Sequence, residues 1–518
     1  MTAGTVDSLF LRYGPAYRWL VTLAGLIGAF AMVLSSTIVN VAVPQVMGAF
    51  GIGQDEAQWM ATAYLATMTA SQLINAWMVA ALGQRLAFIV TLLVYCVGAL
   101  MSALAANIDL LVLGRVLQGG AAGIIQPLVM VTIFQVFPAD RRGLAMGIYG
   151  TGVTLAPGIG PLVGGLVIDS FSWRHIFLVP LPFVGVALLM GMMFMPTRAR
   201  SGPLPRFDWS GYLLLCGALF LAMTAIARGP RDGWLSDRIL LMAIGAAVLT
   251  ALFVISQLRG RTPILDFTLF RHGQFAAATL VAFVFGIGNF GSSYVIPVFV
   301  QAVQGYTATR AGMVLLPAGL ILVLALPMTG RIADRLPDHI PVMIGLACFA
   351  LGMALMADAD VNTPFWTFAA FAAVGRLGMA FILPSLSASA LRVLPPDQLN
   401  KGSGSINFIR QLGGACGTNL IVVWLQLRTY FHSEVLTATQ TAANDTSRVF
   451  LDSVGSRLGA AGIPPALHDP LALDYLGKVV YAQAQAMGFQ DCFLILAIVF
   501  AVALVPALLL RRAGRSAA

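Results

Sequence analysis

Residues 152–165 of the chain read GVTLAPGIGPLVGG. A small residue recurs at every fourth position, which on a helix forms one nearly straight ridge: Gly152, Ala156, Gly160 and Gly164. Pro157 and Pro161 lie in the same apolar run, which ends with Gly165. Prolines would weaken such a helix in water, but a bilayer tolerates them, and rows of small residues let two helices approach closely. The stretch therefore predicts a membrane helix packed tightly against a neighbour.

The composition of the whole chain supports a membrane protein. Of its 518 residues 59% are hydrophobic and 10% are charged, with a mean hydropathy of +0.87. Such values exclude an ordinary soluble domain. The net charge of +9 comes from basic residues scattered through short loops, so it does not indicate nucleic-acid binding. The five cysteines lie in apolar stretches without CxxC spacing, which predicts neither a disulfide framework nor a metal site.

Apolar runs long enough to cross a bilayer recur from end to end. We predict fourteen membrane spans, at residues 19–44, 57–81, 86–106, 109–133, 143–168, 175–195, 209–227, 238–257, 274–300, 311–332, 339–357, 364–390, 403–428 and 488–510. Arginines and lysines of the short loops gather on the side of the N-terminus, which places both termini in the cytoplasm. Residues 429–487 form a polar insert on the opposite side, and we expect it to form short helices lying on the membrane surface.

Two pairs of similar segments within the sequence indicate an internal repeat. Gly114-Arg115 in span four is followed by glycines and a proline, as is Gly375-Arg376 in span twelve. The turn Gly330–Arg335 at the end of span ten corresponds to an uncharged segment at the end of span two. We therefore expect an all-α integral membrane protein of two six-helix bundles, residues 1–200 and 263–518, joined by residues 201–262 with two extra membrane helices. Related halves around a midplane site are typical of secondary transporters.

Several motifs together resemble the major facilitator superfamily, and within it the fourteen-span drug:proton antiporter group of the EmrB/QacA type. They are LSSTIVNVAVP in span one, LLVLGRVLQGG in span four, APGIGPLVGG in span five, WRHIF after it, FDWSG at 207–211, the turn at 330–335 and NFIRQLGGACGT at 407–418. The resemblance covers almost the whole chain. It implies the major facilitator fold and proton-driven export of drugs or other amphipathic compounds by alternating access.

The resemblance and the composition also lead to expectations about location and partners. The Ala- and Arg-rich composition suggests a bacterial inner membrane. The segment FHSEVL, which begins the external insert, is similar to the EmrB branch, and this implies a periplasmic adaptor and an outer-membrane channel as candidate partners. Beyond the lipid bilayer, the remaining expected partner is a small amphipathic substrate, without nucleic acid and without a cofactor.

Charged side chains within spans are expensive and therefore candidates for function. Three arginines lie within spans, Arg115, Arg376 and Arg410, whereas no acidic residue lies near a span centre. The family motif of span one has an Asp where this chain has Ser35. Arg115, at a similar depth, must then bond instead to Gln118, to nearby hydroxyls, to water or to an anionic substrate. Arg410 lies nearer the cytoplasmic end and could also snorkel to the interface.

This departure weakens the usual proton-coupling mechanism, because neither arginine nor serine titrates in the useful range. The acids nearest to membrane depth, Asp109 and Asp491, lie at the outer ends of spans, where they are either proton-titrating groups or solvated helix ends. An exporter or flippase of lipid or anionic amphipathic substrates is therefore an alternative to proton-driven antiport.

Polar residues in or at the ends of spans either join helices or line a substrate cavity. Besides Ser35 and Gln118, those we select as candidates for a cavity are Thr37, Asn40, Gln72, Asn289, Asn407 and Gln411. Gly330, Asp334 and Arg335, like the span-five ridge, are better interpreted as conformational devices, with Asp334 latching the cytoplasmic side. A membrane enzyme would need clustered His, Asp, Glu or Cys at membrane depth, and a channel would need a charged ring for selectivity; the sequence has neither.

Overall fold

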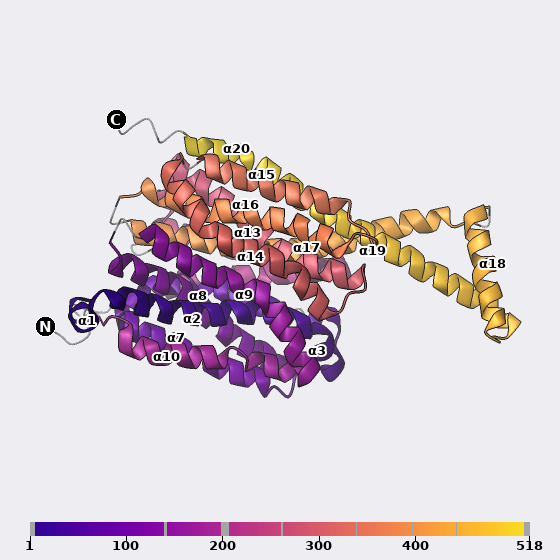
Figure 1. The fold of residues 1–518 in the computed structure, drawn as a ribbon, viewed down its shortest axis with the longest axis horizontal. Coiled ribbons are helices and arrows are strands. Elements are labelled where there is room, and N and C mark those ends of the chain that lie inside the picture. Colours follow the sequence, from indigo (N-terminus) through magenta and orange to yellow (C-terminus); the bar gives the residue numbers. More distant parts are fainter. Residues whose placement is uncertain are drawn as a thin grey trace.

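The computed structural model describes residues 6–57, 59–138, 142–197, 207–260, 263–337, 339–395, 398–441 and 443–511. All regular elements in these ranges are helical. Apolar composition explains this result, because helices satisfy every backbone hydrogen bond within one segment. Most of the long helices run side by side along the long axis of the molecule (Figure 1).

The N-terminal part contains one group of helices around its own core. Its elements are α1 (Val6–Tyr13), α2 (Tyr17–Ile38), η2 (Val39–Ala42), α3 (Val43–Phe50), α4 (Gln54–Ala57), α5 (Trp59–Ser71), α6 (Ile74–Leu82), α7 (Gln84–Ala103), α8 (Ile108–Val136), α9 (Arg142–Ser170), η4 (Trp173–Phe177) and α10 (Leu181–Phe194). A buried apolar cluster runs through this part, including Tyr64, Phe88 and Tyr95.

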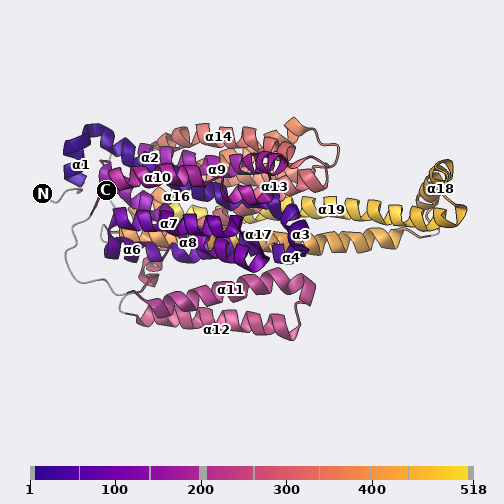
Figure 2. The same cartoon turned by 90° about the horizontal axis from the view of Figure 1, so that it is seen from below.

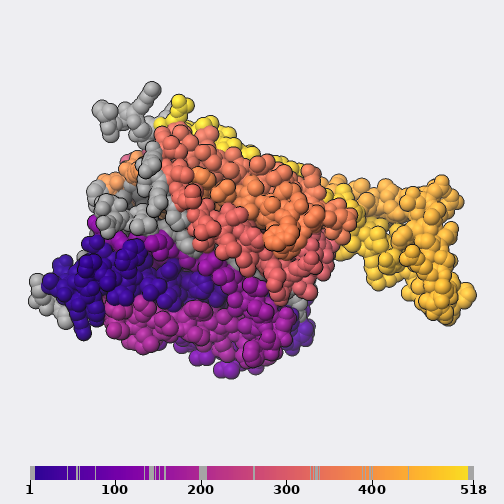
Figure 3. Space-filling model, in the orientation of Figure 1, coloured from indigo at the N-terminus to yellow at the C-terminus, as the bar shows by residue number. Residues whose placement is uncertain are grey.

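The C-terminal part repeats this arrangement. Its elements are η5 (Phe267–Arg271), α13 (Gly273–Ala302), α14 (Ala308–Arg335), α15 (His339–Ala357), α16 (Phe365–Arg392), α17 (Leu399–Thr439), α18 (Asp445–Ala460), α19 (His468–Val502) and α20 (Leu504–Leu508). A second buried cluster, including Phe299, Phe349 and Phe493, holds them together. The two parts lie against each other along a seam that runs the length of the molecule (Figure 3).

Twelve described helical stretches are long and apolar enough to cross a membrane. They coincide with twelve of the fourteen predicted spans. Predicted span 57–81 falls on α5 and α6, which are separated at Gln72 and Leu73 and are 13 and 9 residues long. Predicted span 143–168 falls on α9, a helix of 29 residues that is not among the twelve. The count of fourteen spans stays a prediction.

The two extra helices pair with each other outside the main bundle. They are α11 (Trp209–Asp232) and α12 (Asp237–Arg259), and they lie along one side of the molecule (Figure 2). Asp208 caps α11 by accepting a hydrogen bond from the Gly211 N–H, and it also accepts one from Gln257 at the end of α12. Burial opposes ionisation of Asp208, but these hydrogen bonds outweigh it and hold its pKa below the usual value. The FDWSG motif therefore closes this helical hairpin.

This hairpin also contacts both halves of the bundle. Trp77 of α6 packs against the rings of Phe207 and Trp209, at 5.4 and 5.9 Å between centroids. On the other side, the side-chain amide of Asn419 on α17 contacts the Met223 sulfur of α11 at 3.3 Å. Lys401 of α17 forms an ion pair of 3.0 Å with Asp266, near the start of the C-terminal half. The added helices thus contact both halves of the bundle.

The insert at 429–487 does not form the short surface helices that we expected. Instead α17, of 41 residues, and α19, of 35 residues, continue as a helical hairpin that projects from the bundle and is bridged by α18 (Figure 1). Residues 418–439 contain neither glycine nor proline, so nothing ends α17 at the predicted edge of its span. Phe450 stacks on Tyr475 at 5.9 Å and so joins α18 to α19. We call this protruding hairpin the protrusion; α1 and α20 lie at the opposite end of the molecule.

Candidate functional site

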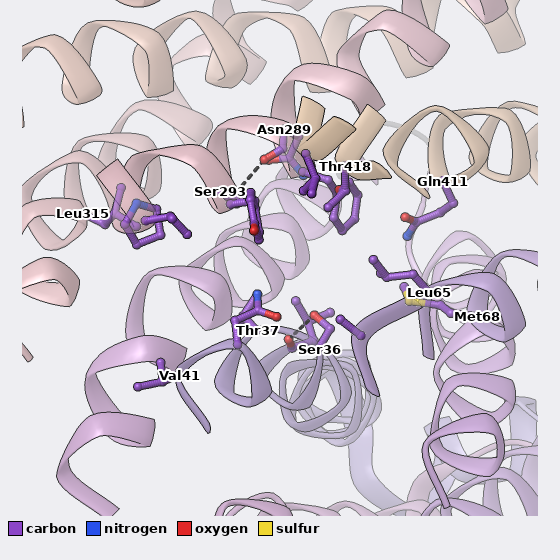
Figure 4. Close-up of a pocket in the computed structure, with 18 of the residues that line it drawn as sticks. Ser36, Thr37, Val41, Leu65, Met68, Asn289, Ser293, Leu315, Gln411 and Thr418 are labelled. Carbon is purple, nitrogen blue, oxygen red and sulfur yellow. Dashed lines mark hydrogen bonds between the residues drawn. The ribbon is translucent and has the colours of Figure 1, made fainter. Parts of the chain in front are cut away.

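A cavity of about 740 Å³ lies between the two halves. Its wall is built from α2, η2, α3 and α5 on one side and from α13, α14, α16 and α17 on the other, with Gln126 of α8 and Val153 of α9. Figure 4 shows Ser36, Thr37 and Val41 facing Asn289, Ser293 and Thr418 across the open space. Drug-sized ligands bind in cavities of about this volume.

The cavity extends toward the protrusion, and contacts between the two halves lie beyond its other end. Met47 after α2 and Gln301 near the end of α13 belong to its wall, and both lie on the side of the protrusion. Deeper in, Arg410 and Gln126 are part of the wall. Beyond them Asn407 and Ser403 of α17 contact the Met130 sulfur of α8, each at 3.6 Å. These contacts join the two halves beneath the cavity floor.

Two of the three predicted arginines belong to the cavity wall, and both come from the C-terminal half. Arg376 of α16 donates to Asn289 Oδ1 at 3.2 Å and to Ser293 Oγ at 3.0 Å, both on α13. Arg410 of α17 has no hydrogen bond or ion pair to any residue that the structure describes. The described lining contains no Asp, Glu, His or Lys. In this wall the positive charge of the two guanidinium groups therefore has no acidic counterpart.

Arg115 has a different environment, sealed within the N-terminal half. It is fully buried and is absent from the cavity wall. Its guanidinium donates to Ser35 Oγ at 3.0 Å, to Gln118 Oε1 at 2.9 Å, to the Ser35 carbonyl at 3.2 Å and to the Met60 carbonyl at 3.0 Å. It also lies 4.1 Å above the ring centre of Tyr64. Serine, amide and carbonyl groups thus take the place of the carboxylate that the family motif supplies.

The span-five ridge lies against α2 at the wall of the cavity. A Cβ atom at Gly160 would collide with the hydroxyl of Thr37, and one at Gly164 would lie 2.9 Å from the Ile38 side chain. Gly152 abuts Leu26, and Ala156 is fully buried. Gly165 faces Thr309 of α14, where a Cβ would come within 3.3 Å. The small residues therefore permit close contact of α9 with α2 and, at one end, with α14 of the other half.

The structure brings together only some of the other predicted polar residues. Thr37, Asn40, Asn289 and Gln411 belong to the cavity wall, whereas Ser35, Gln118, Gln72 and Asn407 do not. Gln72 is buried at the break between α5 and α6, and its side-chain atoms have no partner among the described residues. Sequence reasoning missed Gln126, Tyr294, Gln301 and Asn419, which also line the cavity. Asn419 lies two turns beyond Gln411 on α17, so helical spacing would have found it.

The two acids considered for proton transfer lie outside the cavity wall. Asp109 is exposed in the first turn of α8. Asp491 of α19 accepts hydrogen bonds from Arg428 at 2.6 Å and lies 2.7 Å from the ring nitrogen of His432, both on α17. This cluster joins α17 and α19 at the base of the protrusion. Its geometry suits a structural ion pair.

The predicted cytoplasmic latch falls on side chains that the structure does not describe. The side chains of Asp334 and Arg335 lie outside the described set, as do those of Pro157 and Pro161 in the span-five ridge. Gly330 has no heavy atom within 4 Å of the position that a Cβ would take. The latch stays a prediction. Among the residues searched, no group of His, Cys, Asp or Glu is arranged to hold a metal ion.

Comparison with known proteins gives consistent matches. The family model for the Major Facilitator Superfamily matches residues 25–418. A Mycobacterium tuberculosis protein named "Multidrug resistance protein B homolog" is 31% identical over 481 residues, which cover 91% of this chain and 86% of the relative. A Bacillus subtilis protein named "Multidrug transporter protein MdtP" is 28% identical over 397 residues, 76% of this chain and 73% of the relative.

A solved structure shares the fold. The crystal structure of the human organic anion transporter MFSD10 (TETRAN) aligns with a TM-score of 0.57, covering 95% of this chain and 99% of that chain. The sequence identity is 13%, so this likeness concerns the fold alone.

Proposed function

The chain belongs to the major facilitator superfamily and is a transporter rather than an enzyme, and on that premise we propose that it exports amphipathic organic anions by alternating access. One observation carries the proposal: Arg376 and Arg410 line the central cavity, and the described lining contains no acidic residue. A positive site in an apolar wall attracts an anion and repels a cation, because low-dielectric surroundings strengthen both effects.

The rest of the wall suits the apolar part of such a substrate. Phe285, Phe290 and Leu315 lie in the same wall as the arginines, together with valines and methionines. A cavity that combines an apolar surface with few polar groups binds molecules by their shape and hydrophobicity and orients them by the polar groups. An amphipathic monoanion satisfies both parts of this wall.

Such an exporter needs no titratable carrier in its cavity. If α1 and α20 lie in the cytoplasm, outward movement of one negative charge is favoured by the membrane potential. The gain is about 2.3 kcal/mol per 100 mV. This corresponds to a concentration ratio of about fifty for each 100 mV. Membrane potential alone could thus drive export.

The rival function is proton-driven multidrug antiport of the EmrB/QacA type. It is favoured by the printed names of the bacterial relatives, which describe multidrug resistance and multidrug transport. It would need a proton carrier at the substrate site. Asp491 is paired away from the cavity and Asp109 is exposed at the end of α8, so neither lies where a substrate would bind.

Transport by proteoliposomes distinguishes the two functions. Vesicles are loaded with decanesulfonate or with decyltrimethylammonium, which have matched chains and opposite charges. A potassium gradient with valinomycin imposes a potential, and a separate set receives a pH gradient. We expect inside-negative potential to accelerate efflux of the sulfonate and the pH gradient to have little effect. Efflux of the ammonium compound alone, driven by the pH gradient alone, would establish antiport instead.

We also propose fourteen spans in a bacterial inner membrane, with the α5–α6 pair and α9 added to the twelve stretches and with both termini inside. The protrusion then lies in the periplasm, where the adaptor implied by the EmrB resemblance would have to bind. A membrane-impermeant maleimide tests the orientation in a cysteine-free background. It should label Val449→Cys on α18 in intact cells, whereas Leu11→Cys on α1 should react only after lysis, since both side chains are exposed. The reverse pattern would invert the topology.

A further inference from the structure

We propose that Arg410 alone of the three membrane arginines binds the negative head of the substrate, which enters the cavity head first with its apolar part toward the protrusion. This assignment rests on the proposed function and names the group that recognises the substrate. The head is an oxyanion such as a carboxylate or sulfonate, because a planar guanidinium fork matches two oxygens of one group.

The three membrane arginines differ in their hydrogen-bonding partners. Arg115 is sealed, and its fork is occupied by Ser35 and Gln118. Arg376 has one terminal nitrogen on Asn289 and the other on Ser293. Arg410 lines the cavity, yet the structure describes no residue that accepts a hydrogen bond from it. A guanidinium has five N–H donors, so Arg410 has the most donors left for a ligand.

The backbone of α17 is held tightly against α13 at Arg410. A Cβ at Gly286 of α13 would collide with the carbonyl oxygen of Arg410, and one at Gly413 would collide with the Phe283 backbone. The backbones of α13 and α17 therefore nearly touch at Arg410 and again about one turn later at Gly413. A fixed backbone positions a long cationic side chain with less loss of entropy on binding.

Arg410 lies near the end of the cavity that is farther from the protrusion. The contacts of Asn407 and Ser403 with Met130 join the two halves within about two turns of Arg410 on the same helix. Gln126 belongs to the same cavity wall, and the hydroxyl of Tyr149 donates to the Gln126 carbonyl at 3.5 Å. Arg410, which has no hydrogen-bond acceptor among the described residues, and these polar groups thus mark the end of the cavity away from the protrusion. The open length toward the protrusion is lined by Val41, Met47 and Leu315, which suit an apolar tail.

Equilibrium binding in lipid nanodiscs tests this assignment with radiolabelled decanoate and decyltrimethylammonium, after subtraction of binding to empty discs. Arg410→Gln removes the charge and the fork, Arg410→Lys keeps only the charge, and Arg376→Gln is the matched control. A hydrogen-bonded charge pair corresponds to roughly a ten- to hundredfold change in affinity. We expect Arg410→Gln to weaken decanoate binding by this factor and Arg410→Lys to restore part of it. Arg376→Gln should weaken decanoate binding by a smaller factor than Arg410→Gln does and should lower the melting temperature, because the Arg376 side chain joins α16 to α13.

The outcomes separate this assignment from the proposed function. If the wild-type protein binds decyltrimethylammonium but not decanoate, the proposed function fails and the assignment fails with it. If the wild-type protein binds decanoate, two results overturn the assignment alone. In the first, Arg410→Gln changes the decanoate affinity by less than twofold. In the second, Arg410→Gln weakens that affinity no more than Arg376→Gln does. The melting temperature of each variant shows whether a lost affinity reflects loss of folding.

Discussion

Replacing Ser35 by Asp would restore the acid of the family motif directly beside a buried arginine. Arg115 Nη1 lies 3.0 Å from Ser35 Oγ, and the two residues are 0% and 1% exposed. A carboxylate at this position would place opposite charges about 4 Å apart. With an effective dielectric constant of about 20, their attraction is about 4 kcal/mol. Desolvation of the new carboxylate costs several kcal/mol, so Ser35→Asp alone should change the free energy of unfolding only slightly.

A double-mutant cycle measures the interaction energy between the side chains at positions 35 and 115. Ser35→Asp, Arg115→Gln and the double variant are compared with the wild-type protein by equilibrium unfolding in mixed micelles. In the double variant the carboxylate is buried without a cation, which costs about 3–5 kcal/mol. We therefore expect a coupling energy of about 4 kcal/mol. Ser36→Asp provides the control, since Ser36 faces the cavity and should not couple to Arg115. A coupling below about 1 kcal/mol for Ser35→Asp would refute the described geometry of Arg115.

Three further predictions concern packing, the protrusion and the linking hairpin. Gly286→Ala should destabilise the protein by about 1–3 kcal/mol or more, because the new Cβ would collide with the backbone of α17. Gly291→Ala on the same helix should be tolerated, since the nearest atom to its Cβ is in the Leu496 side chain at 3.6 Å. Equal melting temperatures for the two variants would contradict this prediction. Asp491→Asn should lower the free energy of unfolding by about 1 kcal/mol, because the ion pair that it removes is partly exposed. It should leave the pH dependence of transport unchanged. An altered pH profile would instead indicate that Asp491 carries a proton. Burial opposes ionisation of Asp266, but hydrogen bonds from Thr268 and Lys401 outweigh it and lower its pKa, as hydrogen bonds do for Asp208. The stability that these carboxylates supply is therefore present above their unfolded pKa of 3.8 and is lost as pH falls through their lower folded values. The double variant Asp208→Asn, Asp266→Asn should melt earlier than the wild-type protein at pH 6 and by a smaller difference at pH 3. If the difference in melting temperature does not shrink at pH 3, the ionised carboxylates of Asp208 and Asp266 do not supply this stability.

Much of the architecture could be predicted from hydropathy and local motifs. Apolar runs determine where helices form, because each helix satisfies its own backbone, and the repeated Gly-Arg pairs of spans four and twelve indicated two related halves. The ridge at Gly160 and Gly164 indicated a close helix contact, although only the structure identified α2 as the partner. The prediction of surface helices at 429–487 was wrong because polarity was taken as a sign that the helices end. Polar residues do not end a helix, and α17 and α19 simply continue beyond the bundle.

The sequence by itself determined that three arginines lie at membrane depth without an acid of similar depth. It could not determine which of them a substrate would meet. That depends on the rotation of each helix and on its neighbours: the fold turns Arg115 inward onto Ser35 and Gln118, holds Arg376 against Asn289, and leaves Arg410 toward the cavity. Depth along a helix is a local property that follows from residue order. Which face of that helix meets a cavity depends on contacts between residues far apart in the chain, and only the packed structure fixes those contacts.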